Sequence, residues 1–181
     1  MDFGSWIKDL LGQKIQKISI DAGFTCPNRD GKVGIGGCSF CDNTTFSPAY
    51  CNGNKSVTEK LAAGKAFFTT KYPEMKYLAY FQSFSNTYGS LSRLQKIYKE
   101  ALDDKDVVGI VIGTRPDCIN DEILDYLAQL AKRTFVLVEY GVESVNDDVL
   151  KRINRGHDFK CSLTAVEETA KRGIFVGAHI I

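Results

Sequence analysis

Three cysteines lie close together in one glycine-rich segment of the chain. Eleven residues separate Cys26 from Cys38, and two residues separate Cys38 from Cys41. A Cys-x-x-Cys pair places two thiolates on one metal centre, and the glycines of the eleven-residue insert give the backbone the freedom to bring back the third. In a chain of this length the spacing indicates metal binding rather than a disulfide framework.

The number of thiolates decides which metal centre is expected. A cluster of four irons and four sulfides has four iron corners, so three protein thiolates leave one iron open for another ligand. One alternative is a closed four-thiolate zinc site that adds Cys51 and holds together a nucleic-acid-binding module. Another is that cysteines are unliganded small residues, which is the interpretation we favour for Cys51, Cys118 and Cys161.

Strands and helices alternate along the chain around this segment. Apolar or β-branched runs predict five strands, at residues 15–21, 77–81, 107–112, 134–138 and 174–181. Helices are predicted from the Ser56–Glu59 capping box to Tyr72-Pro73, over 91–102, after the N-cap Asn120, and from Asp158 to Gly173. This order favours parallel βαβ units in a barrel-like or a doubly wound sheet. No strand is followed by Gly-x-Gly-x-x-Gly, which disfavours a dinucleotide-binding enzyme.

Composition sets the class of protein. The 181 residues are 44% hydrophobic, which predicts one domain over 1–181, with the cysteine loop at 22–54. Net charge is +1, but residues 1–100 hold thirteen Lys and Arg against eight Asp and Glu, which permits an anionic substrate.

Residues 1–13 resemble neither a signal peptide nor a membrane anchor, so we expect a cytoplasmic protein. The chain stops inside an apolar strand, so we expect the N-terminal part of a longer domain, truncated after its fifth strand.

The cysteine loop resembles that of the radical S-adenosylmethionine (SAM) superfamily. The resemblance rests on two stretches, Thr25-Cys26-Pro27-Asn28-Arg29-Asp30-Gly31 and Gly36-Gly37-Cys38-Ser39-Phe40-Cys41. Within the superfamily, the loop is similar in particular to that of the YhcC-type group, which is related to the elongator catalytic subunit and to coproporphyrinogen dehydrogenase. It implies a partial (β/α) barrel with a [4Fe-4S] cluster on Cys26, Cys38 and Cys41. It also implies reductive cleavage of SAM to a 5′-deoxyadenosyl radical, with an electron donor such as flavodoxin or ferredoxin. RNA, a small metabolite or a peptide is compatible as substrate.

The resemblance also implies positions that contact SAM. The Gly-Gly-Glu word of many relatives is missing after the second strand, so backbone carbonyls near Gln82 and Ser83 would take its place. Glu143 suits the ribose hydroxyls, and Arg155 suits the carboxylate of SAM. The full set of implied SAM contacts is Phe40, Gln82, Ser83, Glu143, Arg155 and His179.

Two further features of the resemblance have ordinary structural explanations. Arg115 and Asp117 belong to a Thr-Arg-Pro-Asp word shared with elongator-like relatives, although a turn that leads into a helix explains them as well. His157 and His179 are the only histidines, and a lone histidine is more often a structural hydrogen-bonding residue than a ligand.

Overall fold

The fold is a single sheet of five parallel strands. The computed structural model describes residues 1–42, 45, 47–51, 54–69 and 75–181. The strands are β1 (Ile15–Ile20), β2 (Lys76–Phe81), β3 (Val107–Thr114), β4 (Phe135–Glu143) and β5 (Phe175–Ile180), in the spatial order β1-β2-β3-β4-β5. Each strand pairs in parallel with the next one along the chain. A sheet that winds in one direction without a switch point is a partial (β/α) barrel, which confirms the predicted α/β class and strand number.

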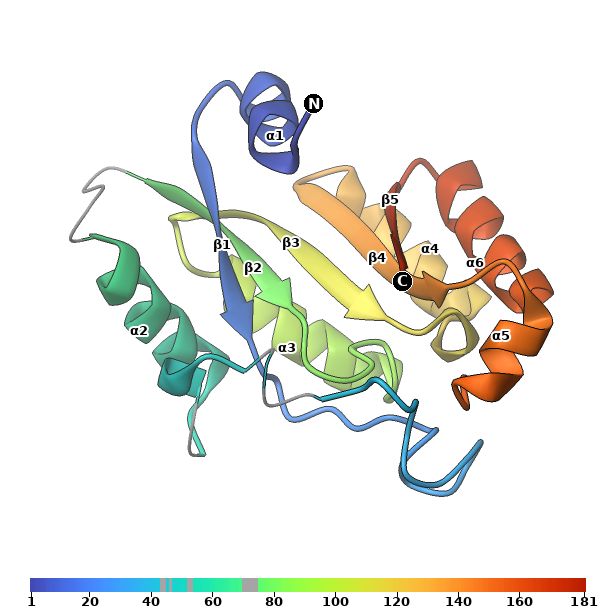
Figure 1. The fold of residues 1–181 in the computed structure, drawn as a ribbon. Coiled ribbons are helices and arrows are strands. Elements are labelled where there is room, and N and C mark those ends of the chain that lie inside the picture. Colours follow the sequence, from blue (N-terminus) through green and yellow to red (C-terminus); the bar gives the residue numbers. More distant parts are fainter. Residues whose placement is uncertain (43–44, 46, 52–53, 70–74) are drawn as a thin grey trace.

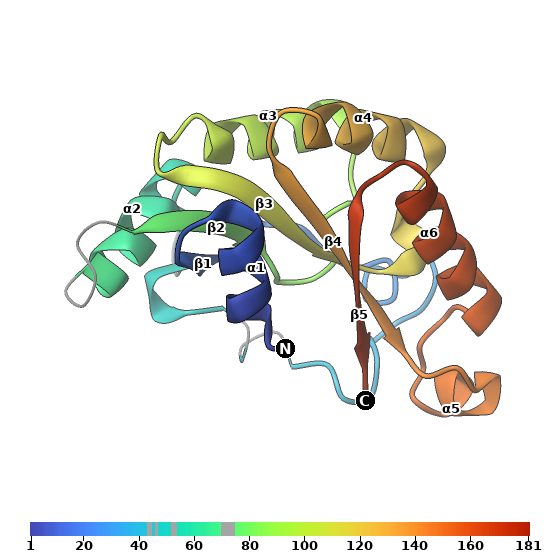
Figure 2. The same cartoon turned by 90° about the horizontal axis from the view of Figure 1, so that it is seen from above.

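Helices form an outer layer on the convex face of this sheet. Figure 2 shows them following the curve of the sheet from β1 to β5. They are α2 (Val57–Thr69), α3 (Leu91–Leu102), α4 (Asp121–Ala131) and α6 (Phe159–Lys171). The short helix α5 (Asp147–Arg152) follows β4 at its carboxyl end, and two 3-10 turns, η2 (Ala49–Cys51) and η3 (Pro116–Cys118), lie in loops.

The helix starts are those that the sequence predicts. Ser56 and Glu59 form a capping box, because Ser56 N donates to the Glu59 carboxylate at 2.7 Å and Glu59 N donates to Ser56 Oγ at 3.1 Å. Asn120 caps α4 through a bond from Ile123 N, and Asp158 caps α6. The predicted end of the first of these helices, at Tyr72-Pro73, lies outside the described residues.

The main core lies between the sheet and the outer helices. Its fully buried members include Ile18, Leu61, Phe81, Leu94, Tyr98, Ile110, Ile112, Leu127 and Val138. β3 and β4 are buried along most of their length, as parallel strands covered on both faces must be.

A helix that the sequence analysis did not predict covers the inner face of the sheet. α1 (Phe3–Leu11) begins at the N-cap Asp2 and ends at Gly12, whose φ of 71° suits glycine. Trp6 packs edge-on against Phe135 and Phe175, at ring-centroid distances of 6.0 and 5.5 Å. In Figure 1, α1 lies over the amino ends of the strands, which leaves the carboxyl ends of the inner face open.

Two strands run further than predicted. β3 continues past Ile112 through Gly113 to Thr114, and β4 begins at Phe135 and continues past Val138 to Glu143. The apolar runs end earlier because inward-facing positions near the carboxyl edge carry polar or small residues. No helix in the described part of the chain is long and apolar enough to cross a membrane.

Candidate functional site

A cavity of about 400 Å³ opens where the carboxyl ends of the strands meet the cysteine loop. In parallel α/β sheets this edge is where loops from several strands converge on a ligand. Eight of the nine predicted site residues line the cavity: Cys26, Cys38, Phe40, Cys41, Gln82, Glu143, Arg155 and His179. Ser83 does not line it. Its hydroxyl is buried and lies 2.8 Å from Ser47 Oγ, while its carbonyl accepts from Asn86 Nδ2.

Two tight turns shape the cysteine loop. Arg29 N donates to the Cys26 carbonyl at 2.8 Å, and Cys41 N donates to the Cys38 carbonyl at 3.0 Å. Gly37 has a φ of 84°, and a Cβ there would lie 2.8 Å from Arg29 Nε, so only glycine fits. Each thiol is therefore carried on a hydrogen-bonded turn of the loop.

The donor set of the cavity includes three thiols, the number that leaves one corner of a four-iron cluster open. In the part of the chain that the structure describes, no three His, Cys, Asp or Glu side chains are placed to hold one metal ion. A single zinc needs all of its ligands within about 2.3 Å of one point, whereas a cubane binds each thiolate through a different iron. Three thiols on the wall of one cavity suit the second arrangement.

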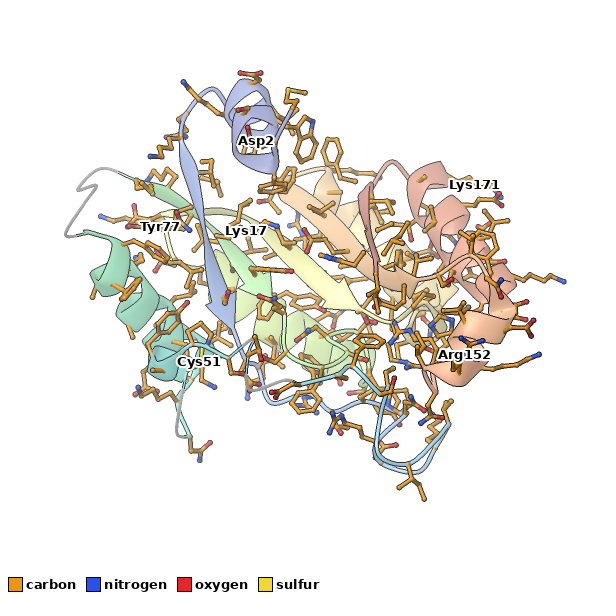
Figure 3. All side chains as sticks on the ribbon, viewed as in Figure 1. Asp2, Lys17, Cys51, Tyr77, Arg152 and Lys171 are labelled. Atoms are coloured by element: carbon orange, nitrogen blue, oxygen red, sulfur yellow. The ribbon has the colours of Figure 1, made fainter. Side chains whose placement is uncertain are left out.

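Cys51 stands apart from the other three cysteines. Its thiol is buried, donates to the Ser19 carbonyl at 3.4 Å and is not part of the cavity wall. Burial also raises its pKa, which disfavours the thiolate that a metal needs. Figure 3 shows Cys51 beside the amino-terminal end of α2, on the side of the molecule opposite Arg152 of α5. The four-thiolate zinc arrangement is therefore not formed in the structure.

The cysteine loop is held by a segment far away in sequence. In Figure 1 it runs from the tip of β1 below the sheet toward α5. Asn28 Nδ2 donates to the Asn154 carbonyl at 2.6 Å, and in return Asn154 Nδ2 donates to the Gly37 carbonyl at 2.8 Å. Ser39 N donates to the Ile153 carbonyl at 3.0 Å. We call these bonds between 28–39 and 153–154 the latch.

Arg155 follows the latch and points into the site. Only 6% of its surface is exposed, its Nη1 lies 3.3 Å from Cys38 Sγ, and its Nη2 donates to the Gly141 carbonyl. Glu143 Oε1 lies 3.8 Å from Nη2. Burial raises the pKa of Glu143 although Arg155 opposes the change. The arginine thus joins the cysteine loop to the end of β4.

Arg115, a buried residue on the wall of the cavity, forms an ion pair with the half-buried Asp117. Nε and Nη2 of Arg115 donate to the two carboxylate oxygens of Asp117 at 2.8 and 2.7 Å. Burial opposes the charge on Arg115, but Asp117 outweighs it and raises the pKa of the guanidinium. The turn explanation offered by the sequence is correct for the backbone, because both residues stand at the start of η3. It is incomplete for Arg115, which also lines the cavity.

An ionic cluster that the sequence analysis did not predict lies on the inner face of the sheet. Lys17 Nζ lies 2.8 Å from Glu139 Oε1, and His179 Nε2 lies 3.2 Å from Glu139 Oε2. Burial raises the pKa of Glu139, but hydrogen bonds from His179, Lys17 and Tyr80 outweigh it and lower the pKa to about 2. In return Glu139 raises the pKa of His179. A lysine between isoleucines in the strand Ile15–Ile20 was the signal that could have revealed an inward-facing polar layer.

Comparison with known proteins agrees with this fold. The sequence pattern of the Radical SAM superfamily matches residues 25–181. Uncharacterized protein YtqA of Bacillus subtilis is 40% identical over 97% of this chain and 54% of its own length. Protein YhcC of Escherichia coli K12 is 37% identical over 99% of this chain and 57% of its own length. The chain spans about half the length of these relatives.

Solved structures agree on the fold. The N-terminally deleted Elp3 of Methanocaldococcus infernus superposes with a TM-score of 0.59 at 16% identity, over 92% of this chain and 38% of that one. The cobalamin-dependent SAM radical enzyme OxsB, with SAM bound, also gives 0.59, at 17% identity, over 90% of this chain and 23% of that one. Fold and site together define a partial parallel barrel with a three-cysteine loop at its carboxyl edge. The chain belongs to the radical SAM superfamily, in the YhcC-type group related to the elongator catalytic subunit.

Proposed function

We propose that this chain holds a [4Fe-4S] cluster on Cys26, Cys38 and Cys41 and acts as a radical SAM enzyme. The observation that carries the proposal is that these three thiols, all within the part of the chain that matches the superfamily, line one cavity at the carboxyl edge of the sheet. When bound, the cluster and SAM supply one-electron cleavage of a carbon–sulfur bond, which yields methionine and a 5′-deoxyadenosyl radical. The electron comes from a donor such as flavodoxin or ferredoxin.

The chain's own residues bind and orient SAM in this proposal. Glu143 accepts hydrogen bonds from the ribose hydroxyls, Phe40 lies beside the adenine, and Arg155 and His179 contact polar groups of the molecule. Gln82 supports the amino group in place of the missing Gly-Gly-Glu word. Ser83 contributes least, because its side chain and carbonyl already have partners inside the protein.

The same proposal covers the organisation of the protein. Residues 1–181 form the N-terminal part of a radical SAM barrel domain, with the cluster loop at 22–54. We place the protein in the cytoplasm, where low-potential electron donors reduce such clusters. The inner face, which α1 closes at its amino end, shields the radical from water at that end.

For the substrate we propose RNA or an RNA-linked group. One similar protein favours it, because its name states that it acts on tRNA. A protein named tRNA uridine(34) acetyltransferase, from Methanocaldococcus infernus, is 30% identical over 51% of this chain, and Elongator complex protein 3 of Mus musculus is 36% identical over 41%. The excess of basic residues in 1–100 suits an anionic polymer.

Metal analysis of four cysteine variants tests the cluster. The chain is reconstituted anaerobically with iron and sulfide, and both are quantified per protein beside visible and EPR spectra. We expect about four irons and four sulfides per chain, lost in Cys26→Ala, Cys38→Ala and Cys41→Ala but kept in the matched control Cys51→Ala. Tightly bound zinc that depends on all four cysteines would refute the proposal.

Incubation of the reduced protein with SAM tests the chemistry. We expect 5′-deoxyadenosine and methionine to appear in the wild type and to be absent from Cys38→Ala. A fully loaded cluster that binds SAM without releasing either product would mean that the cluster is structural.

A further inference from the structure

The sulfur of Cys38 receives two side-chain hydrogen bonds, one from within the cysteine loop and one from the segment after α5. Arg155 Nη1 lies 3.3 Å from Cys38 Sγ, and Asn28 Nδ2 lies 3.6 Å from the same atom. Both distances lie within the range for hydrogen bonds to sulfur. A thiolate that binds a metal accepts such bonds more strongly than a neutral thiol, because it carries negative charge.

Both donors are fixed in place. Asn28 is fully buried, and its amide also donates to the Asn154 carbonyl at 2.6 Å. Arg155 is 6% exposed and is anchored by its second terminal nitrogen on the Gly141 carbonyl. These second hydrogen bonds hold both side chains, so both groups face the sulfur before any cofactor binds.

We infer that Arg155 and Asn28 raise the reduction potential of the cluster that Cys38 holds. The inference rests on the proposed function. Reduction adds one negative charge to the cluster, and hydrogen bonds to its sulfurs favour the more negative state. Arg155 adds a permanent positive charge, since a guanidinium is not deprotonated in proteins. Glu143, 3.8 Å from this arginine, offsets part of that charge.

A redox titration of the reconstituted chain measures the effect directly. SAM is left out, dithionite with mediator dyes supplies single electrons, and EPR reports the reduced cluster at each potential. For Arg155→Gln we expect the ratio of reduced to oxidised cluster at a fixed potential to fall about tenfold, which is about 59 mV for a one-electron couple. Arg155→Lys keeps the charge and shifts the ratio less, and Asn28→Leu shifts it in the same direction as Arg155→Gln.

Asn154→Gly is the matched control for a loosened loop. The backbone at Asn154 has a φ of 54°, which suits glycine. The substitution removes the hydrogen bond from Asn154 Nδ2 to the Gly37 carbonyl and leaves both hydrogen-bond donors to Cys38 in place. We expect its potential to match that of the wild type. Iron content is measured for every variant, and Arg155→Lys provides the comparison if Asn28→Leu fails to load a cluster.

The outcomes separate the inference from the proposed function. If the wild type carries four irons but Arg155→Gln shifts the potential no more than Asn154→Gly does, the inference is wrong and the proposed function stands. An Arg155→Gln variant with unchanged SAM-free potential and weakened SAM binding would show that this arginine serves SAM alone. A wild-type chain that assembles no cluster would overturn both.

Discussion

The ionic cluster around Glu139 makes a prediction whose size follows from the structure. The Glu139 side chain is 9% exposed, and its carboxylate is 2.8 Å from Lys17 Nζ. Its pKa falls from 4.5 to about 2 on folding, because three hydrogen bonds outweigh the cost of burial. A carboxyl with a lowered pKa stabilises the fold above its unfolded pKa and loses that contribution as pH falls toward the folded pKa. Each unit of lowered pKa corresponds to about 1.4 kcal/mol of folding free energy, and we discount this value because one partner, His179, is half-exposed. Glu139→Gln therefore lowers the free energy of unfolding by about 2 to 3 kcal/mol at pH 7.

Urea unfolding of the cluster-free chain at pH 5.5 and pH 3 tests this value. In the wild type Glu139 raises the pKa of His179, which is therefore protonated at both pH values. We expect Glu139→Gln to be less stable than the wild type by about 2 to 3 kcal/mol at pH 5.5 and by about 1 kcal/mol at pH 3. A difference that stays constant or grows as pH falls would refute the reasoning.

Glu143→Gln is the control, because Glu143 lies on the same strand but its effect on stability changes with pH in the opposite direction. Burial raises the pKa of Glu143, so its charge opposes folding above its unfolded pKa. We expect this variant to gain stability relative to the wild type as pH rises from 3 to 5.5. The same unfolding curves measure it.

Two further predictions concern the scaffold. Gly64 of α2 packs directly on β1, and a Cβ there would lie 2.3 Å from Ile18 Cγ2, so Gly64→Ala overpacks the core and costs about 1 to 3 kcal/mol in thermal or urea unfolding. A neutral effect would show that α2 moves freely away from the sheet. Asn120→Ala removes the cap on Ile123 N and costs about 1 kcal/mol, whereas Asn120→Asp keeps it, and equal stability of the two variants would contradict the assigned cap.

The sequence predicts most of the scaffold because local signals and tertiary packing agree there. The Ser56–Glu59 capping box and the β-branched run that begins at Val107 both specify elements that the sheet then buries. The helix α1 was missed although it has the N-cap Asp2 and Gly12 at its end. Phe3, Trp6, Ile7 and Leu11 recur at helical spacing, so the sequence did carry the signal of an amphipathic helix. What it could not show is that these side chains pack on the inner face of the sheet. α5 was missed because it is a six-residue helix held by its surroundings.

The site was predictable where the type of residue dictates the chemistry. The three clustered thiols could be found from spacing alone, and the structure places them on one cavity. The place of Arg155 beside Cys38 could not be found in this way, because 117 residues separate the two and only the docking of the latch brings them together. Lys17 and Glu139, 122 residues apart, meet through sheet register and inward orientation, which no local pattern encodes.

The latch also determines when the cysteine loop acquires its shape. Asn28 and its partner Asn154 are 126 residues apart, and the contacts between them close across four strands of the sheet. A ribosome releases the N-terminal residues first, so the cysteines emerge long before the residues that arrange them. The nascent chain therefore carries the three thiols without these loop contacts until residue 154 has emerged. A ligand that reaches the thiols before that point meets a loop without its latch, whereas one that arrives later meets the loop in its folded shape.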